Sequence, residues 1–147
     1  MISKPFLILF AEDDLGHATL VQRNLKRAGI ANPIVHVKDG QEALDFIRSE
    51  GRYAGQAPHN PMLIVLDINM PRVDGVEVLR QVKTSEQTAN IPIIMLTTTD
   101  DPREIERCYE HGCSVYITKP VSHEEFVEAI KRLGLFLQIV EIPQRKD

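Results

Sequence analysis

The 147-residue sequence has few cysteines, no excess of basic residues and no long apolar run. Its two cysteines, Cys108 and Cys113, match neither the spacing of a metal knuckle nor that of a redox pair, which argues against a disulfide framework. A formal net charge of -4 provides no basic face for nucleic acid, so no nucleic-acid-binding domain is expected. The first apolar run is too short for a signal peptide or a membrane span, which predicts a cytoplasmic protein without a membrane partner.

Short apolar runs alternate with amphipathic stretches along the chain. The runs are continuous, as is typical of strands buried on both faces, and they cover residues 6–10, 34–37, 62–66, 91–96 and 115–117. Apolar residues at helical spacing follow each run, and the last such stripe begins at Phe126. Five strands alternating with five helices predict an α/β fold: a flavodoxin-like, doubly wound parallel sheet of five strands in the order 2-1-3-4-5, with helices on both faces.

Several polar residues mark the expected helix starts. Asp14 and Asp74 are candidate N-caps of the first and third helices, and Asp101 is followed by a proline that suits the first helical position. Ser122 opens a capping box for the last helix. Asp39 and the glycine after it are interpreted as a plain turn behind the second strand.

Other polar residues fall where the strands end. The first strand runs into Glu12 and Asp13, the third into Asp67, the fourth into Thr97 and the fifth into Lys119. Because the carboxyl ends of parallel strands share one edge of a sheet, these side chains are expected to converge at the switch point between strands 1 and 3. Each residue alone has an ordinary structural explanation, such as a cap or a turn, but their coincidence at one edge favours a site.

The chemistry of that site follows from its charges. Crowded carboxylates disfavour ionisation, and a hard divalent cation relieves that conflict. Mg²⁺ needs only one or two protein carboxylates, so it is the expected cofactor, with Mn²⁺ as the alternative ion. With the ion and Lys119 in place the edge accommodates a tetrahedral anion, and a carboxylate such as Asp67 is a nucleophile toward phosphorus.

Four segments carry a family resemblance: FLILFAEDD at 6–14, LDINMPRVDG at 66–75, IIMLT at 93–97 and YITKP at 116–120. They resemble the receiver domains of bacterial response regulators, of which the chemotaxis regulator is a single-domain member. The resemblance implies that residues 1–133 form a receiver domain and that the chain accepts a phosphoryl group from a histidine kinase. It also implies a phosphorylation-dependent switch with slow autodephosphorylation, and no dedicated enzyme activity.

The resemblance also assigns roles to individual residues. It implies that Asp67 is the phosphoacceptor and a metal ligand. It also implies that Asp13 binds the metal directly, while Glu12 binds it through water. Asn69 stands where the family uses a main-chain carbonyl as a further metal ligand. Thr97 and Lys119 would contact the phosphoryl group. Tyr116 occupies the position of the aromatic switch residue, whose ring turns inward on activation.

A narrower likeness involves the polar loop at 51–61, which contains Tyr53, and the ending Leu-x-x-Val-x-Ile-Pro at 137–143. Both are similar to the single-domain regulators paired with bacterial phytochromes and related histidine kinases. In that group the extension, here residues 134–147, makes dimer contacts. Two arrangements stay open for this apolar tail: it forms a homodimer, or it packs on its own domain. With no output domain expected, a partner protein of unknown identity must read the switch.

Two enzyme or cofactor classes compete with this interpretation. A phosphatase of the haloacid dehalogenase type also uses an aspartyl nucleophile, but it needs a second acid where this chain has Asn69. A flavodoxin-like flavin binder needs a hydroxyl- or glycine-rich phosphate loop after the first strand, where Glu12 and Asp13 would repel a phosphate. A receiver fold that has lost phosphorylation is disfavoured because all the required groups are present.

Overall fold

The computed structural model describes residues 6–27, 29–57 and 61–119, together with Glu124 and Glu128. Its elements in chain order are β1 (Leu7–Ala11), α1 (Leu15–Arg27), β2 (Ile34–Val37), α2 (Gly40–Arg48), the 3-10 helix η1 (Gly51–Tyr53), β3 (Met62–Leu66), α3 (Gly75–Thr84), β4 (Ile93–Thr97), α4 (Pro102–Glu110) and β5 (Val115–Thr118). The predicted fifth helix and the tail at 134–147 lie outside the described residues, apart from the two glutamates.

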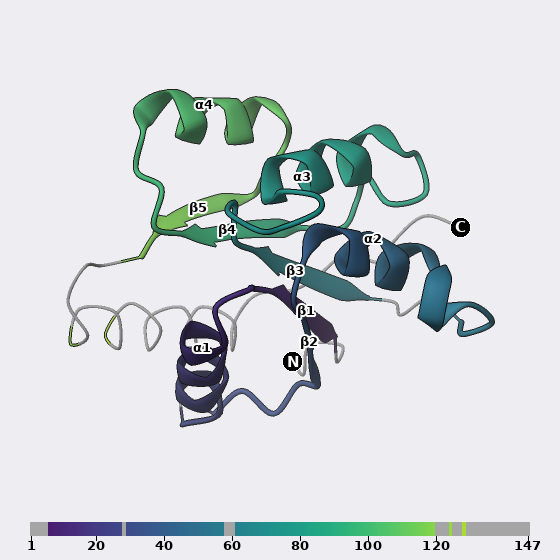
Figure 1. Cartoon of the computed structure of the whole chain (residues 1–147), viewed down its shortest axis with the longest axis horizontal. Helices are drawn as coiled ribbons and strands as arrows, with labels where there is room; N and C mark the ends of the chain where they lie inside the picture. The colour runs from purple at the N-terminus through teal and green to yellow at the C-terminus, as the bar shows by residue number, and fades with distance from the viewer. Residues whose placement is uncertain (1–5, 28, 58–60, 120–123, 125–127, 129–147) are drawn as a thin grey trace, which may run out of the picture.

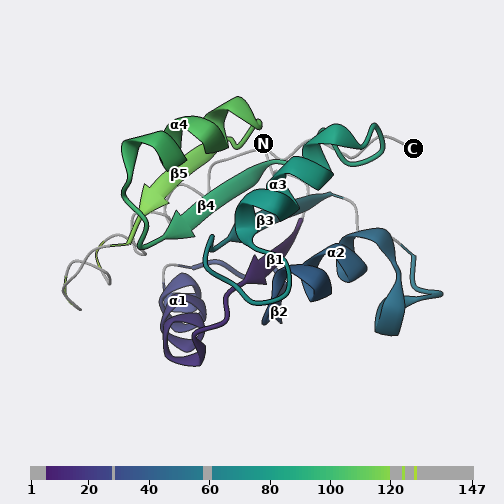
Figure 2. The same cartoon turned by 45° about the horizontal axis from the view of Figure 1, so that its top comes forward.

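The five strands form one parallel sheet in the order β2-β1-β3-β4-β5, which confirms the predicted topology. The helix α1 lies on one face, and α2, α3 and α4 lie on the other (Figures 1 and 2). The central strands β1, β3 and β4 are buried throughout, whereas the edge strands β2 and β5 are mostly half-buried. Burial on both faces therefore explains the continuous apolar runs of the central strands only.

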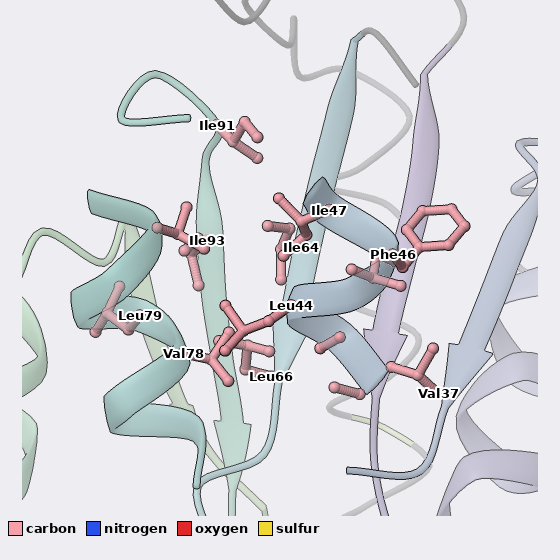
Figure 3. Packing of buried hydrophobic residues seen from close by; sticks show 14 of the residues in the cluster. Val37, Leu44, Phe46, Ile47, Ile64, Leu66, Val78, Leu79, Ile91 and Ile93 are labelled. Carbon is pink, nitrogen blue, oxygen red and sulfur yellow. The ribbon is translucent and has the colours of Figure 1, made fainter. Parts of the chain in front are cut away.

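The side chains of the larger core fill the space between the sheet and α2 and α3. Leu44 and Ile47 of α2 pack with Leu79 of α3 above Ile64 and Ile93 of the strands (Figure 3). A second cluster lies under the opposite face, between α1 and the sheet. The two cysteines are free thiols buried in the larger core, consistent with the predicted lack of a disulfide.

Capping accounts for where several helices begin. Asp74 accepts a hydrogen bond from the N–H of Glu77, and Asp101 accepts one from the N–H of Arg103, as predicted. The interpretation of Asp39 as a plain turn residue is wrong. Its side chain accepts from the N–H of Glu42 at 2.8 Å, so Asp39 is the N-cap of α2 and the helix follows β2 almost directly.

The loop predicted at 51–61 has more structure than its polar sequence indicated. It begins with η1, whose Tyr53 is buried edge-on against Phe46 with ring centroids 5.0 Å apart. The Tyr53 hydroxyl donates to Glu42 Oε1 at 3.1 Å, and Arg52 lies over the tyrosine ring and pairs with the same carboxylate. The aromatic ring anchors this segment to α2, which its composition alone did not reveal.

Candidate functional site

The site lies along the edge where the strands end. The register pairs Ala11 of β1 with Leu66 of β3, so the residues that follow them, Glu12 and Asp67, leave the sheet side by side. The N–H of Asp67 donates to the Ala11 carbonyl at 3.1 Å and continues this ladder by one residue. Parallel pairing thus brings together two carboxylates that are 55 positions apart in the sequence.

The remaining predicted residues reach the same edge from β4 and β5. Thr97 is the last residue of β4 and pairs in register with Thr118. The N–H of Lys119 then donates to the Thr97 carbonyl at 2.7 Å, which fixes where the lysine side chain leaves the backbone. Thr97 is fully buried and Lys119 is 3% exposed, so both side chains belong to the interior of the site.

The three acidic residues form a compact oxygen cluster. Glu12, Asp13 and Asp67 each offer one carboxylate oxygen, and these atoms lie within 4.8 Å of one another. Glu12 and Asp67 are buried, whereas Asp13 is exposed and gives the cluster a side that opens to solvent. An all-oxygen donor set with an open side fits a hard divalent cation that keeps part of its water shell.

Lys119 neutralises much of this negative charge. Its ammonium donates to Glu12 Oε1 in a short buried contact and lies 3.4 Å from Asp67 Oδ2. The resemblance implied that Lys119 contacts a phosphoryl group and that Glu12 faces the metal. In this structure the two side chains contact each other directly.

Burial, hydrogen bonds and nearby charges shift the pKa values of Glu12 and Asp67 in opposite directions. Burial is the main cause that raises the pKa of Glu12 to about 7, and the nearby Asp67 adds to it while Lys119 opposes it. Burial alone would also raise the pKa of Asp67, but hydrogen bonds from Thr97 and Glu12 and the charge of Lys119 outweigh it and lower that pKa. Asp67 is therefore the ionised acid of the pair, as a nucleophile must be.

The loop between β3 and α3 folds closely around Asp67. The N–H of Asn69 donates to Asp67 Oδ1 at 3.4 Å, and the N–H of Gly75 donates to the Ile68 carbonyl at 2.9 Å. A Cβ atom on Gly75 would lie 2.0 Å from the Asp67 carbonyl oxygen, so only glycine fits at the start of α3. This contact helps to fix the backbone that carries the acceptor.

A chain of hydrogen bonds joins this loop to β5. The Asn69 side-chain amide donates to Thr99 Oγ1 at 3.2 Å, and the Tyr116 hydroxyl donates to the Thr99 carbonyl at 2.5 Å. The Tyr116 ring packs against the larger core and its N–H donates to the Tyr109 hydroxyl of α4. Thr99 thus links Tyr116, the candidate aromatic switch residue, to the loop between β3 and α3. The sequence did not predict this role of Thr99.

His17 is a second residue that the sequence reasoning missed. It lies in the first turn of α1, where its N–H donates to Asp14 Oδ1 at 3.0 Å. Its Nδ1 atom lies 3.3 Å from the Lys119 ammonium. A histidine four residues after an acidic pair was the available signal, but only the packing of α1 brings it to Lys119.

Residues 8–131 match the family described as the response regulator receiver domain. The chain belongs to this family. It is therefore a receiver domain of a two-component system and not a dedicated enzyme, which excludes the phosphatase and flavin-binding alternatives. Within the part of the chain that the structure describes, no helix is both long and apolar enough to cross a membrane.

Relatives of this receiver domain include small, single-domain regulators. It is 38% identical to the probable methanogenesis regulatory protein FilR2 of Methanothrix harundinacea, covering 89% of this chain and 84% of FilR2. It is 31% identical to the response regulator Rcp1 of Synechocystis, covering 95% of this chain and 94% of Rcp1.

Solved structures give the same result for the fold. A receiver domain from Rhodospirillum rubrum superimposes with a TM-score of 0.86 at 43% identity, covering 96% of this chain and 99% of that one. The Mn²⁺-bound form of Rcp1 superimposes with a TM-score of 0.87 at 31% identity, covering 95% and 99%. The bacteriophytochrome response regulator RtBRR superimposes with a TM-score of 0.74 at 38% identity, covering 97% and 85%. The predicted likeness to phytochrome-associated regulators is confirmed.

Proposed function

We propose that this receiver domain accepts a phosphoryl group on Asp67 from the phosphohistidine of a sensor kinase. A carboxylate oxygen of Asp67 forms a bond to phosphorus while the phosphorus–nitrogen bond of the donor breaks. The electron pair of that bond stays on the imidazole nitrogen, which then takes up a proton. The single observation that carries the proposal is the buried carboxylate of Asp67 beside a lysine and two further acids.

The acidic cluster supports a role for a divalent cation. Asp13 and Asp67 would hold Mg²⁺ directly with the main-chain carbonyl of Asn69, and Glu12 would hold it through water; Mn²⁺ is the alternative ion. The bound ion supplies positive charge to the carboxylates and to the incoming phosphoryl oxygens. Support comes from the oxygen donor set of this chain and from the Mn²⁺-bound form of its relative Rcp1.

Lys119 and Thr97 complete the proposed site. The Lys119 ammonium pairs with a phosphoryl oxygen once its ion pair with Glu12 has opened, and the Thr97 hydroxyl donates to a second one. The added charge biases the Thr99 link toward a second conformation and so alters the surface around Tyr116 and α4. Slow hydrolysis of the aspartyl phosphate resets the switch.

The partner of this cytoplasmic switch is inferred from its relatives. Because Rcp1-type and bacteriophytochrome regulators resemble the chain over nearly its whole length, a phytochrome-like histidine kinase is the proposed donor. The downstream reader is a separate protein. Residues 134–147, outside the described region, are proposed as a homodimer contact. Sedimentation of the full chain against a variant with Ile139→Asp and Val140→Asp tests this, and an unchanged mass would refute it.

Incubation with Mg²⁺ and acetyl phosphate tests the acceptor. Intact mass should rise by one phosphoryl group in the native protein and in the control Asp14→Asn, but not in Asp67→Asn. Asp14 lies beside the site as an exposed N-cap, and asparagine caps a helix equally well. Labelling that persists in Asp67→Asn, or none in the native protein, would refute the proposal.

A further inference from the structure

The Lys119 ammonium has more partners than the resemblance explains. An ammonium carries three hydrogens and donates only. Glu12 Oε1 and Asp67 Oδ2 account for two contacts, and the third is the His17 Nδ1 atom at 3.3 Å. All three contacts converge on a lysine side chain that is 1% exposed, so the ammonium depends on protein acceptors rather than on water.

The geometry of His17 fixes which ring atom acts. Because Lys119 can only donate, we assign Nδ1 as the acceptor of this contact, which leaves Nε2 as the protonated nitrogen. The N–H of His17 is tied to Asp14 Oδ1 in the first turn of α1, which holds the residue close to the end of β1. The imidazole side chain is 42% exposed, so it lies between the buried Lys119 ammonium and the solvent.

We propose that His17 is a positioning residue of the phosphorylation site, whose Nδ1 atom holds the Lys119 ammonium beside Asp67. The inference rests on the proposed function, in which Lys119 leaves Glu12 to pair with a phosphoryl oxygen. When that ion pair opens, the hydrogen bond to His17 is the contact from outside the acidic cluster that keeps the ammonium at the site. A lysine side chain that is already held by His17 has less conformational entropy. Less of that entropy is therefore lost when the ammonium pairs with the phosphoryl group.

Three substitutions separate this role from simple coverage of the site. His17→Leu keeps bulk but removes the acceptor, and His17→Ala removes both. His17→Asn restores an acceptor, because asparagine Oδ1 is attached to Cγ as histidine Nδ1 is. His111→Leu is the matched control, because it removes an imidazole at the far end of α4, which leads into the opposite edge of the sheet.

The measurement is the time course of phosphorylation of the full chain by acetyl phosphate and Mg²⁺, over a range of donor concentrations. The limiting rate should fall roughly tenfold in His17→Leu and His17→Ala, the range for one lost hydrogen bond to a charged group. His17→Asn should recover most of that loss, and His111→Leu should match the native protein. Mn²⁺ affinity should be unchanged throughout, since His17 is not among the acidic cluster.

The outcomes distinguish this inference from the function on which it rests. If native protein is labelled on Asp67 and His17→Leu reacts at the native rate, the positioning role is refuted while the function stands. If His17→Asn is as slow as His17→Leu, the Nδ1 contact is not the cause and the inference is also refuted. If the native protein is never labelled, the proposed function itself fails.

Discussion

Arg72 donates two hydrogen bonds to the Asp39 carboxylate, from Nε to Oδ2 at 3.1 Å and from Nη2 to Oδ1 at 3.0 Å. The pair joins the loop after the acceptor strand to the N-cap of α2. Burial opposes ionisation of Asp39, but the hydrogen bonds from Arg72 and the N–H of Glu42 prevail and lower its pKa. Arg72 has a φ of 66°, a left-handed conformation that costs a side-chain-bearing residue some energy. The contact therefore offsets local strain within the loop between β3 and α3.

A double-mutant cycle measures this contact. Arg72→Ala and Asp39→Asn should show a coupling free energy of about 0.5–1 kcal/mol by urea denaturation, because the pair is partly exposed and Asn preserves the cap. Arg72→Gly should be more stable than Arg72→Ala by about 1 kcal/mol, since glycine adopts positive φ freely. Additive effects in the cycle would show that the Arg72–Asp39 ion pair contributes nothing to the free energy of unfolding.

The second prediction concerns Gly75, whose added Cβ would meet the Asp67 carbonyl oxygen at 2.0 Å. Gly75→Ala should destabilise the fold by about 2 kcal/mol or more and slow phosphorylation, because the clash moves the acceptor backbone. The control is Gly55→Ala, which has φ of 86° but nothing within 4 Å of the new atom, so it should cost only about 1 kcal/mol. Equal stability and equal phosphorylation rates in the two variants would contradict the steric argument.

A parallel sheet was predictable from the alternation of buried runs and helices, and right-handed crossovers left few strand orders, among them the observed one. The first and last residues of each strand were less predictable from the sequence. The fourth run was expected to pair from Ile91, but β4 begins at Ile93. The Ile91 N–H donates to the Thr88 carbonyl in the preceding turn, and Pro92 has no N–H to donate. An Asp-Gly pair signals both turns and helix starts, and the sequence alone did not show that α2 follows β2 directly.

Part of the candidate site was also predictable from the sequence, and part was not. Parallel pairing brings all strand ends to one edge, so Glu12, Asp67 and Lys119 were expected together, and the structure places them there. The contacts of His17 and Thr99 were not predicted by that rule. They depend on how α1 and the loop after β4 pack against the sheet.

The third prediction concerns the pH dependence of stability without divalent ions. The folded pKa of Glu12, about 7, lies above its ordinary value of 4.5, so the folded state binds the proton more tightly. This contribution is fully present below pH 4.5 and is lost as pH rises through 7. Denaturant unfolding should show that Glu12→Gln gains stability relative to the native protein by roughly 2–4 kcal/mol between pH 4.5 and pH 8. A pH-independent difference would show that burial does not perturb Glu12.

The last prediction separates the exposed acid of the cluster from its neighbour. Asp13 contributes an oxygen to the cluster, whereas Asp14 uses its carboxylate to accept the N–H of His17. Asp13→Asn should weaken Mn²⁺ or Mg²⁺ binding at least tenfold, or about 1.4 kcal/mol, because it removes a charged oxygen ligand. Asp14→Asn keeps the cap and should change the affinity far less.

Isothermal titration of the two variants with Mn²⁺ decides the matter. Both should unfold near the native denaturant midpoint, since both side chains are exposed and an asparagine serves as an N-cap as well as an aspartate does. Equal losses of affinity in Asp13→Asn and Asp14→Asn would mean that the ion responds to general negative charge. A loss confined to Asp13→Asn means that the ion occupies the cluster formed with Glu12 and Asp67, beside the oxygen that takes the phosphoryl group.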